Sequence, residues 1–408
     1  MSSKKYISIL GRQPIIGIAE LERLYGSVRW FSPLSAIVES RDFDFNRLGG
    51  SQKAGVVVAE LRGNNWHNIS RQVVKAYESA WSGVEHKITL GISVYGFDDV
   101  PSREVQQTGI ILKKKLRSRG VSLRLLPNSE NALNTATSHH NKLGLSDNKV
   151  ELLIVKSSND AVIVAESVGA QNITALARRD QERPKRDAFV GMLPPKLAQI
   201  IVNLGVGEIG VGDWDSKADT LRVLDPFCGT GVVLQEAALM GYSIYGTDNN
   251  PKMIDYSEQN IDWLAANFHL LASKSSTPNS QPTIALADAM TAHWQSPIDV
   301  VATETYLGQP FSAPPSPPKL AEVRGNCENI IRSFLQNIGN QIEPGAPLCV
   351  AIPAWKDVEG NFTHLPLTRD IETLGYKRVQ FSTINPKDLL YHRDDQVVAR
   401  ELLVLIKA

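Results

Sequence analysis

A glycine-containing loop between Leu224 and Gly231 has the residue types and the spacing of a ligand-binding loop. It reads Leu-Asp-Pro-Phe-Cys-Gly-Thr-Gly and follows a short apolar stretch that predicts a β-strand. Gly229 and Gly231 let the backbone approach a ligand, and the helix predicted after them offers its N-terminus. The loop lacks the third glycine of the dinucleotide fingerprint and the Gly-Lys-Ser/Thr of a P-loop. An NAD-dependent oxidoreductase and a P-loop nucleotide-binding protein are therefore both disfavoured.

Three acidic residues follow three successive predicted strands. Asp225 precedes the glycines by four residues, Asp248 ends the next strand, and Asp288 ends the third. A carboxylate at the first position repels pyrophosphate and suits an ammonium group. The second can accept both hydroxyls of a ribose, and the third can accept from an adenine amine. A ligand with these parts in this order is S-adenosylmethionine, whereas the alternative interpretation is a set of ordinary polar residues at strand ends.

The elements that must position these acids alternate regularly in the second half of the chain. Strands are expected at residues 220–225, 243–248, 283–288, 298–303, 346–352, 376–385 and 396–406. Helices are expected at residues 232–240, 250–267, 319–340 and 366–374. Strands that alternate with helices predict a Rossmann-like α/β fold, with a parallel sheet covered on both faces.

The first half of the chain is less regular and predicts α+β structure. Strands are expected at residues 4–11, 28–39, 54–61, 88–95, 121–126, 150–156 and 161–168, and helices at 17–25, 66–82 and 103–119. The pattern predicts a boundary near residue 85 and a charged, proline-containing connector before the α/β part. The predicted domains are residues 1–85, residues 86–170, a linker at 171–196 and the α/β domain at 197–408.

Composition places the chain among soluble globular proteins. It has 408 residues, of which 42% are hydrophobic and 21% charged, and its length predicts two or three domains. No apolar run approaches the roughly 18 residues of a membrane-spanning helix. The three cysteines are Cys228, Cys327 and Cys349, which lack metal-ligand spacing and suit a reducing compartment. The sequence therefore predicts a cytoplasmic protein with no metal and no membrane partner.

Charge is unevenly distributed along the chain, although the formal net charge is zero. Residues 1–200 hold 28 Lys and Arg against 19 Asp and Glu, whereas residues 201–408 hold 15 against 24. A basic half joined to an acidic half indicates that the first half binds a polyanion. Six cations gather on and after one predicted helix: Lys113, Lys114, Lys115, Arg117, Arg119 and Arg124. They are candidates for salt-dependent contacts to phosphates, and the alternative is a solvated helix face.

Two further stretches connect the glycine loop to a known family. The loop Asp225-Pro-Phe-Cys-Gly-Thr-Gly231 resembles motif I of the tRNA guanine-N2-methyltransferases that carry a THUMP domain. The connector is similar to the family's lead into its catalytic domain, through Arg179-Asp180, Arg183-Pro184, Arg186-Asp187-Ala188, Gly191-Met-Leu-Pro-Pro-Lys-Leu-Ala-Gln199 and Asn203-Leu204. The opening segment, Ile9-Leu-Gly-Arg-Gln-Pro14 with Ala19-Glu-Leu-Glu22, is similar as well. The resemblance spans about residues 4 to 308 and is closest to the guanosine-10 N2-methyltransferases.

The resemblance implies a complete set of expectations. The fold is a class I methyltransferase domain preceded by a ferredoxin-like domain at residues 1–85 and a THUMP-like, RNA-binding domain at 86–170. S-adenosylmethionine is bound by Asp225, Phe227, Gly229, Gly231, Asp248 and Asp288. The partner is tRNA, methylated on the N2 amine of a guanine, and position 10 is expected. A small activating subunit, which some eukaryotic relatives need, is a second candidate partner.

The loop after the fourth strand departs from the family pattern. The family form is Asp/Asn-Pro-Pro-Tyr/Phe-Gly, whereas this chain reads Ala302-Thr-Glu-Thr-Tyr-Leu-Gly308. Because the guanine amine is a poor nucleophile, the family uses a side-chain oxygen to hold it and an aromatic ring to stack on the base. Glu304 and Tyr306 are the candidates for these two roles. The alternatives are another amine, in a different tRNA guanine, an rRNA guanine or DNA adenine N6, and a tRNA-binding protein whose catalytic loop has decayed.

Overall fold

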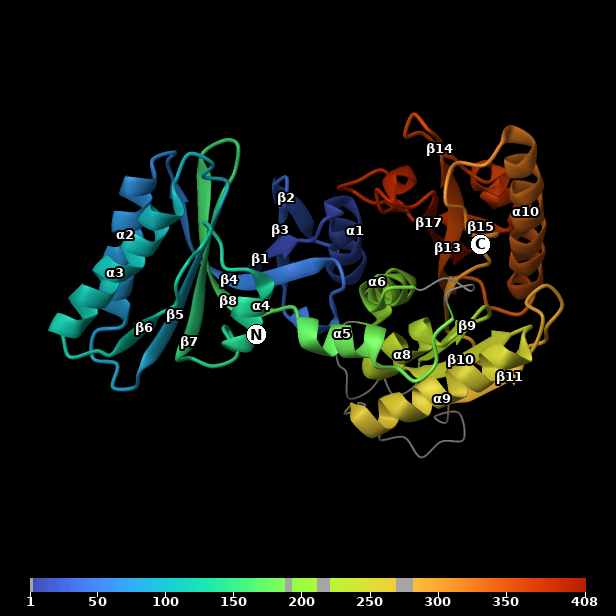
Figure 1. Ribbon diagram of the computed structural model, residues 1–408, viewed down its shortest axis with the longest axis horizontal. Coiled ribbons are helices and arrows are strands. Elements are labelled where there is room, and N and C mark those ends of the chain that lie inside the picture. Colours follow the sequence, from blue (N-terminus) through green and yellow to red (C-terminus); the bar gives the residue numbers. More distant parts are fainter. Residues whose placement is uncertain (1–2, 188–192, 211–220, 269–281) are drawn as a thin grey trace. The chain divides into compact units, whose positions relative to one another are not determined.

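The computed structural model describes residues 3–187, 193–210, 221–268 and 282–408 (Figure 1). The chain divides into two compact units. Unit 1 comprises Met1–Pro14, Ser27–Asn46 and Ser51–Ala175, and unit 2 comprises Ile15–Gly26, Arg47–Gly50 and Leu176–Ala408. In the described part of the chain, no helix has both the length and the apolar character needed to cross a bilayer.

Unit 1 is built on one eight-stranded sheet with the order β2-β3-β1-β4-β8-β7-β5-β6. The strands are β1 (Lys4–Leu10), β2 (Val28–Ser32), β3 (Ser35–Ser40), β4 (Ser51–Arg62), β5 (Ile88–Tyr95), β6 (Leu123–Leu125), β7 (Lys149–Lys156) and β8 (Ala161–Ala170). The long strand β4 pairs with β1 on one side and with β8 on the other. The sheet therefore runs through the boundary expected near residue 85, and the ferredoxin-like and THUMP-like domains on either side of it remain predictions.

Two helices cover one face of this sheet, and a short one lies beside it. α2 (Trp66–Ala80) and α3 (Ser102–Ser118) lie side by side against β5, β6 and β7, and α4 is Thr135–His140 (Figure 1). Both long helices are amphipathic, because apolar residues recur every three or four positions. Ile69, Val73 and Tyr77 of α2 join Val105 and Leu112 of α3 in the core over the sheet.

Unit 2 contains a nine-stranded sheet whose main order is β11-β10-β9-β12-β13-β17-β15. Its strands are β9 (Arg222–Asp225), β10 (Ser243–Asp248), β11 (Thr283–Leu286), β12 (Val300–Glu304), β13 (Pro347–Lys356), β14 (Phe362–Thr363), β15 (Tyr376–Arg378), β16 (Leu390–Tyr391) and β17 (Val398–Lys407). The strands from β11 to β13 are parallel, and β17 is antiparallel to both β13 and β15. The Rossmann-like fold expected for this half is confirmed. The strand order reverses at β9, and such sheets bind ligands beyond the carboxyl ends at that point.

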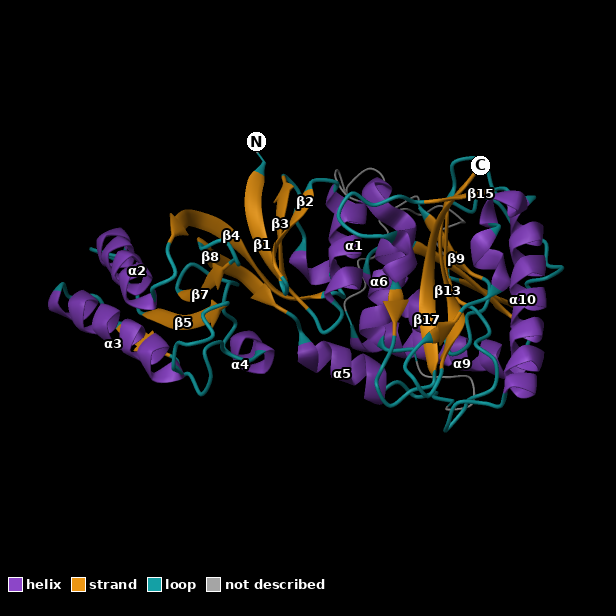
Figure 2. Cartoon of the chain, turned by 90° about the horizontal axis from the view of Figure 1, so that it is seen from above, coloured by secondary structure: helices purple, strands orange, loops and turns teal. Residues whose placement is uncertain are grey.

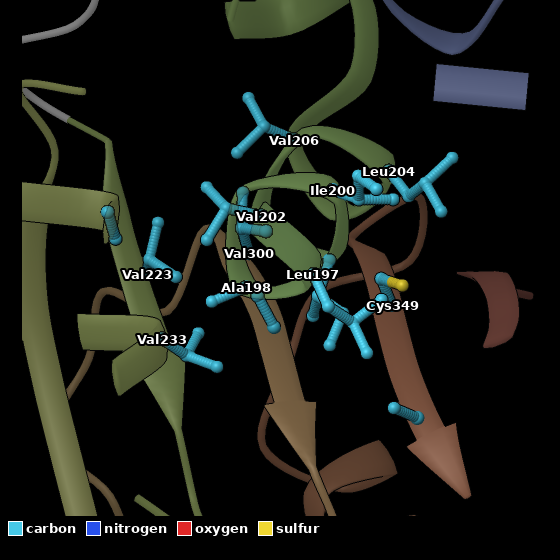
Figure 3. Packing of buried hydrophobic residues seen from close by; sticks show 14 of the residues in the cluster. Leu197, Ala198, Ile200, Val202, Leu204, Val206, Val223, Val233, Val300 and Cys349 are labelled. Atoms are coloured by element: carbon cyan, nitrogen blue, oxygen red, sulfur yellow. The ribbon is translucent and has the colours of Figure 1, made fainter. Parts of the chain in front are cut away.

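Helices cover both faces of the unit 2 sheet. They are α1 (Pro14–Tyr25), α6 (Pro195–Val206), α8 (Val232–Leu239), α9 (Pro251–Asn267) and α10 (Pro317–Gly339), and α5 (Ile173–Gln181) precedes α6 in the chain. α6 and α10 lie on opposite sides of β13 in both views (Figures 1 and 2). Figure 3 shows α6 packed against Val223 of β9, Val300 of β12 and Cys349 of β13. The opposite face is closed by one stripe of α10: Val323, Cys327, Ile331, Phe334, Leu335 and Ile338.

Segments from far along the chain complete unit 2. Glu20 of α1 is fully buried and accepts hydrogen bonds from the amides of Gly49 and Gly50, at 2.9 and 2.8 Å. It also accepts one from Asn203 Nδ2 of α6 at 2.7 Å, and Asn203 donates to the Arg47 carbonyl. Burial raises the pKa of Glu20. These bonds satisfy a buried carboxyl group that would otherwise be costly to keep in the core.

The closing segment differs most from the expected elements. Residues 366–374 form two 3₁₀ turns, Pro366–Arg369 and Ile371–Leu374, rather than one α-helix. The strand expected at 376–385 is β15, which ends at Arg378. A third 3₁₀ turn, Pro386–Asp388, precedes β16.

Candidate active site

A cavity of about 690 Å³ opens where the carboxyl ends of β9, β10 and β12 meet. Its volume falls in the range of small-molecule sites. It brings together seven residues that the sequence singled out: Asp225, Phe227, Gly229, Asp248, Asp288, Glu304 and Tyr306. Gly231 does not line the cavity but caps α8 in a left-handed conformation, with φ at 78°.

Asp225 ends β9 and is 1% exposed. The Thr303 hydroxyl donates to its Oδ1 at 2.6 Å, and the Phe227 amide donates at 3.3 Å. Burial, together with the nearby Asp248 and Glu304 carboxylates, raises the pKa of Asp225 to about 7 despite these two bonds. A buried carboxyl group in this state gains most from a cationic ligand.

Asp248 ends β10 and fixes the glycine loop. Its Oδ2 accepts from the Gly229 amide at 3.0 Å, and its Oδ1 accepts from the Asn250 amide at 2.9 Å. Each carboxylate oxygen has two lone pairs, so both can still accept from a ligand hydroxyl. Burial raises the pKa of Asp248. The loop is closed from behind by Ser257, whose hydroxyl donates to the Gly229 carbonyl at 2.8 Å.

Asp288 and Phe227 line another part of the same cavity wall. Asp288 follows β11 and its Oδ1 accepts from the Met290 amide at 2.9 Å, while no described residue donates to its Oδ2. The Phe227 ring meets Phe334 of α10 edge to face, with centroids 5.1 Å apart. The aromatic contact holds Phe227 where it can pack on a flat ligand.

Glu304 ends β12 and is paired with an arginine from a distant strand. Its Oε1 accepts from Arg400 Nε of β17 at 2.6 Å, and the two side chains are 12% and 8% exposed. Among the described residues no hydrogen bond reaches Glu304 Oε2, while Glu304 itself lines the cavity. Oε1 therefore contacts the Arg400 guanidinium, and Oε2 can accept a hydrogen bond from a ligand.

Tyr306 lies two residues further along the cavity wall and is 47% exposed. Gly308 follows with φ at 83°, packed so closely on α10 that a Cβ atom would lie 2.6 Å from Val323 Cγ1. Asn326 and Asn329 of α10 also line the cavity. Within the described chain their side-chain amides form no hydrogen bond, so both remain available to a bound molecule.

The connector that supports the family resemblance is anchored to unit 2. Arg179 donates from Nε and Nη2 to Glu236 of α8, at 2.6 and 3.0 Å, and both side chains are buried. Asn260 of α9 donates to the carbonyls of Lys185 and Thr230, which ties the connector to the glycine loop. Residues 188–192, which include Ala188, Gly191 and Met192 of the resembling stretch, lie outside the described residues, as do 211–220 and 269–281.

The six expected RNA-binding cations lie in unit 1, and two of them are already paired. Lys115 and Arg119 form ion pairs with Glu78 of α2, at 2.7 and 2.8 Å. The other four side chains are exposed and have no ion pair in the described part of the chain: Lys113, Lys114, Arg117 and Arg124. His139 and His140 end α4, and the described residues hold no group of three or more metal-ligating side chains.

Sequence reasoning missed four residues of the site. Thr303 and Arg400 contact the two carboxyl groups, and Asn326 and Asn329 line the cavity. Arg400 lies almost a hundred residues from Glu304 in the chain, so the sequence offers no sign that the two are partners. The three-residue spacing of the two asparagines on a predicted helix was the available signal for them.

Comparison with known proteins gives one family match. Residues 184–293 match the model of the "RMKL-like, methyltransferase domain" family. This segment holds the glycine loop, Asp248 and Asp288, and it ends before Glu304.

Two curated relatives and a solved structure are also similar. A tRNA (guanine(10)-N2)-dimethyltransferase of Methanothermobacter thermautotrophicus is 28% identical over 183 residues, which are 44% of this chain and 45% of that protein. The protein of the same name from Pyrococcus abyssi is 38% identical over 71 residues, 17% of this chain and 18% of that one. The chain thus matches less than half of either relative. The crystal structure of TrmN from Thermus thermophilus covers 99% of this chain and all of its own, with 16% identity and a TM-score of 0.49. The resemblance to tRNA guanine-N2-methyltransferases is confirmed, and the matched segment of unit 2 is similar to an RMKL-like methyltransferase domain.

Proposed function

We propose that the protein transfers a methyl group from S-adenosylmethionine to the exocyclic N2 amine of a guanine in tRNA. The observation that carries the proposal is one cavity lined by carboxyl groups from the ends of β9, β10 and β12 and from the loop after β11. The names of the two curated relatives support tRNA as the substrate and position 10 as the target.

The residues present fit S-adenosylmethionine. Asp225, buried and with a raised pKa, would attract the ammonium group. Asp248 would accept the ribose hydroxyls, and Asp288 the adenine amine. When bound, the cofactor supplies a methyl group on a sulfonium, which passes to the amine while the sulfur keeps the bonding electron pair. The glycine loop would lie along the ligand, since Gly229 lines the cavity and carries no side chain to obstruct it.

Glu304 and Tyr306 would act on the guanine. Glu304 Oε2 would accept an N–H of the amine and hold its lone pair in line for attack. As the new bond forms, the amine nitrogen becomes cationic, and its surplus proton passes to Glu304 and then to solvent. The exposed Tyr306 ring would stack on the base, which must leave its helical stack to reach the cavity.

Unit 1 would bind the tRNA backbone. Exposed cations of α3 and β6 would contact phosphates in a manner that depends on salt, and unit 1 would thereby select the nucleotide that reaches the cavity. We place the protein in the cytoplasm with tRNA, where a small activating subunit is a second candidate partner.

The test is a methyl-transfer assay with purified protein, labelled S-adenosylmethionine and unmodified tRNA transcripts, followed by nucleoside mass spectrometry. N2-methylguanosine or N2,N2-dimethylguanosine is the expected product, and fragment mapping locates the base. Glu304→Ala is expected to abolish transfer while the cofactor still binds. Methylation of another nucleoside would overturn the guanine assignment. Binding of tRNA and cofactor without transfer, by the protein alone and with its cognate activator, would indicate a tRNA-binding protein.

A further inference from the structure

The ion pair between Glu304 and Arg400 joins two strands that are not neighbours. β13 lies between β12 and β17, and its Ala351 is in register with Glu304 on one side and with Leu402 on the other. Side chains alternate between the faces of a sheet, so Glu304 and Arg400 share the face that carries Ala302 and Leu402. Ala351 and Pro353 of β13 are the residues in register with Glu304 and Arg400, so the ion pair spans the central strand.

We infer that Arg400 is a positioning residue for methyl transfer, which orients Glu304 so that Oε2 is presented to the target amine. The inference rests on the proposed function and adds to it a residue that does not line the cavity. Arg400 donates to Oε1 at 2.6 Å, and this bond fixes the rotamer of a side chain that is longer than the Asp or Asn of the family loop.

The charge on Arg400 answers a specific problem of this site. Glu304 shares the cavity wall with two other carboxyl groups, Asp225 and Asp248, and all three are largely buried. Repulsion between like charges would turn a free Glu304 side chain away from the other two. The Arg400 guanidinium opposes that movement through the ion pair.

The sequence of the loop explains why Glu304 needs a side-chain partner. The two prolines of the family form would stiffen the backbone beside the acid, and residues 303–306 contain neither. Here the constraint comes from the side chain instead, through an ion pair to β17. Thr305 adds a second tie, since its amide donates to the Ala351 carbonyl at 3.0 Å.

Three variants separate positioning from folding. Arg400→Met removes the guanidinium and keeps most of the apolar stem, Arg400→Lys keeps a charge, and E304Q/R400M removes both members of the pair. We expect kcat of Arg400→Met to fall about 100-fold, with the Kd for S-adenosylmethionine unchanged, which is the size of a lost acid–base contribution. Arg400→Lys should recover about tenfold of this loss, because the charge returns without the planar fork.

A double-mutant cycle provides the decisive readout. If Arg400 acts through Glu304, adding Arg400→Met to Glu304→Gln lowers kcat no further, because the group it serves has already lost its charge. Single-turnover assays with excess protein keep the slow variants measurable. Full additivity of the two losses would overturn the inference, and so would a wild-type kcat in Arg400→Met.

Arg378→Met is the matched control. Arg378 of β15 is 10% exposed and lies 3.5 Å from Glu401, the residue next to Arg400 on β17 but on the other face of the sheet. It should lower the melting temperature about as much as Arg400→Met and leave kcat unchanged. Equal losses of kcat in both variants would show that Arg400 only supports the fold. A wild-type protein that transfers no methyl group would instead overturn the proposed function itself.

Discussion

Asp225 shows how burial prepares a carboxyl group for a cationic ligand. Its pKa rises from the usual 3.8 to about 7 because water is excluded and two other carboxylates lie nearby. A folded-state pKa above the unfolded value means that this group favours the folded protein below about pH 4. That contribution is lost as the pH rises through 7. The free protein therefore carries a destabilising charge at neutral pH, which a bound ammonium group would compensate.

We expect the affinity for S-adenosylmethionine to depend on this titration. Lowering the pH from about 8 to about 6 should weaken binding about tenfold, because the ligand binds the ionised form of a group with a pKa near 7. Isothermal titration calorimetry across this range measures the effect.

Asp225→Asn is the control for the pH effect. It should bind the cofactor more weakly at pH 8 and show little change with pH. Because it removes a buried charge, its melting temperature at pH 8 should equal or exceed that of the wild type. A pH dependence that persists in Asp225→Asn would assign the titration to another group, such as Asp248.

A second prediction for a single residue concerns the substitution Gly308→Ala. A Cβ atom there would lie 2.6 Å from Val323 Cγ1, and the backbone is left-handed. Gly308→Ala should destabilise the protein by about 1–3 kcal/mol and displace the loop that carries Tyr306. We expect kcat to fall more than the cofactor Kd rises. Gly325→Ala, in the helix α10 on which Gly308 packs but with open space around it, should change neither kcat nor the cofactor Kd.

At the scale of elements, α3 presents two kinds of cation. Lys113, Lys114 and Arg117 are exposed and unpaired among the described residues, whereas Lys115 and Arg119 are held by Glu78. The triple variant K113A/K114A/R117A should weaken tRNA binding and lower the slope of log Kd against log salt by about 2–3. The double variant K115A/R119A should have the smaller effect for each cation removed. Filter binding at several salt concentrations distinguishes them, and equal slopes in the wild type and the triple variant would exclude α3 from the interface.

The elements that could be predicted are those with strong local signals. Residues 88–95 were expected as a strand and form β5 with the same bounds, because β-branched and apolar residues dominate the segment. The single strand expected at 28–39 is a hairpin, β2 and β3, since Pro33 and Leu34 turn the chain. The helix expected at 366–374 is interrupted at Asp370, whose φ of −130° lies outside the helical region, so only two short 3₁₀ turns form.

The residues of the candidate site also differ in whether a local sequence signal predicts them. Asp225, Asp248 and Asp288 could be found because each follows its own strand, and parallel strands end at one edge. The ion pair between Glu304 and Arg400 could not be found from the sequence, because it depends on β17 lying beside β13. Nothing within either segment specifies that neighbour. The pairing of Glu78 with Lys115 and Arg119 is hidden for the same reason, since it depends on how α2 packs on α3.

At the scale of the whole molecule, unit 2 is discontinuous in the sequence. α1 buries Ile16 and Ala19 in its core, and Glu20 is bonded to Asn203 of α6. A fragment of residues 176–408 lacks these contacts, although it contains every strand of its sheet. It should therefore unfold at a lower temperature than the full chain, or fail to unfold cooperatively, since burying one Ile side chain stabilises by about 1.5–3 kcal/mol.

Circular dichroism on the fragment, with and without a synthetic peptide of residues 12–50, checks this expectation. The peptide should raise the melting temperature by restoring α1 and the 47–50 segment. The same peptide carrying Glu20→Ala should restore less. A fragment that unfolds like the full chain would show that α1 is dispensable to the core.

The discontinuity of unit 2 has a consequence for its synthesis and inheritance. α1 leaves the ribosome well before α6, by a time on the order of 10 s at ordinary rates of elongation. Until then its apolar face has no partner, and α1 is a natural target for a chaperone that binds nascent chains. A single genetic crossover also cannot transfer unit 2 intact, because any cut between residues 50 and 176 leaves α1 behind. The two units are therefore expected to be inherited together, with α1 changing in step with the helix that it covers.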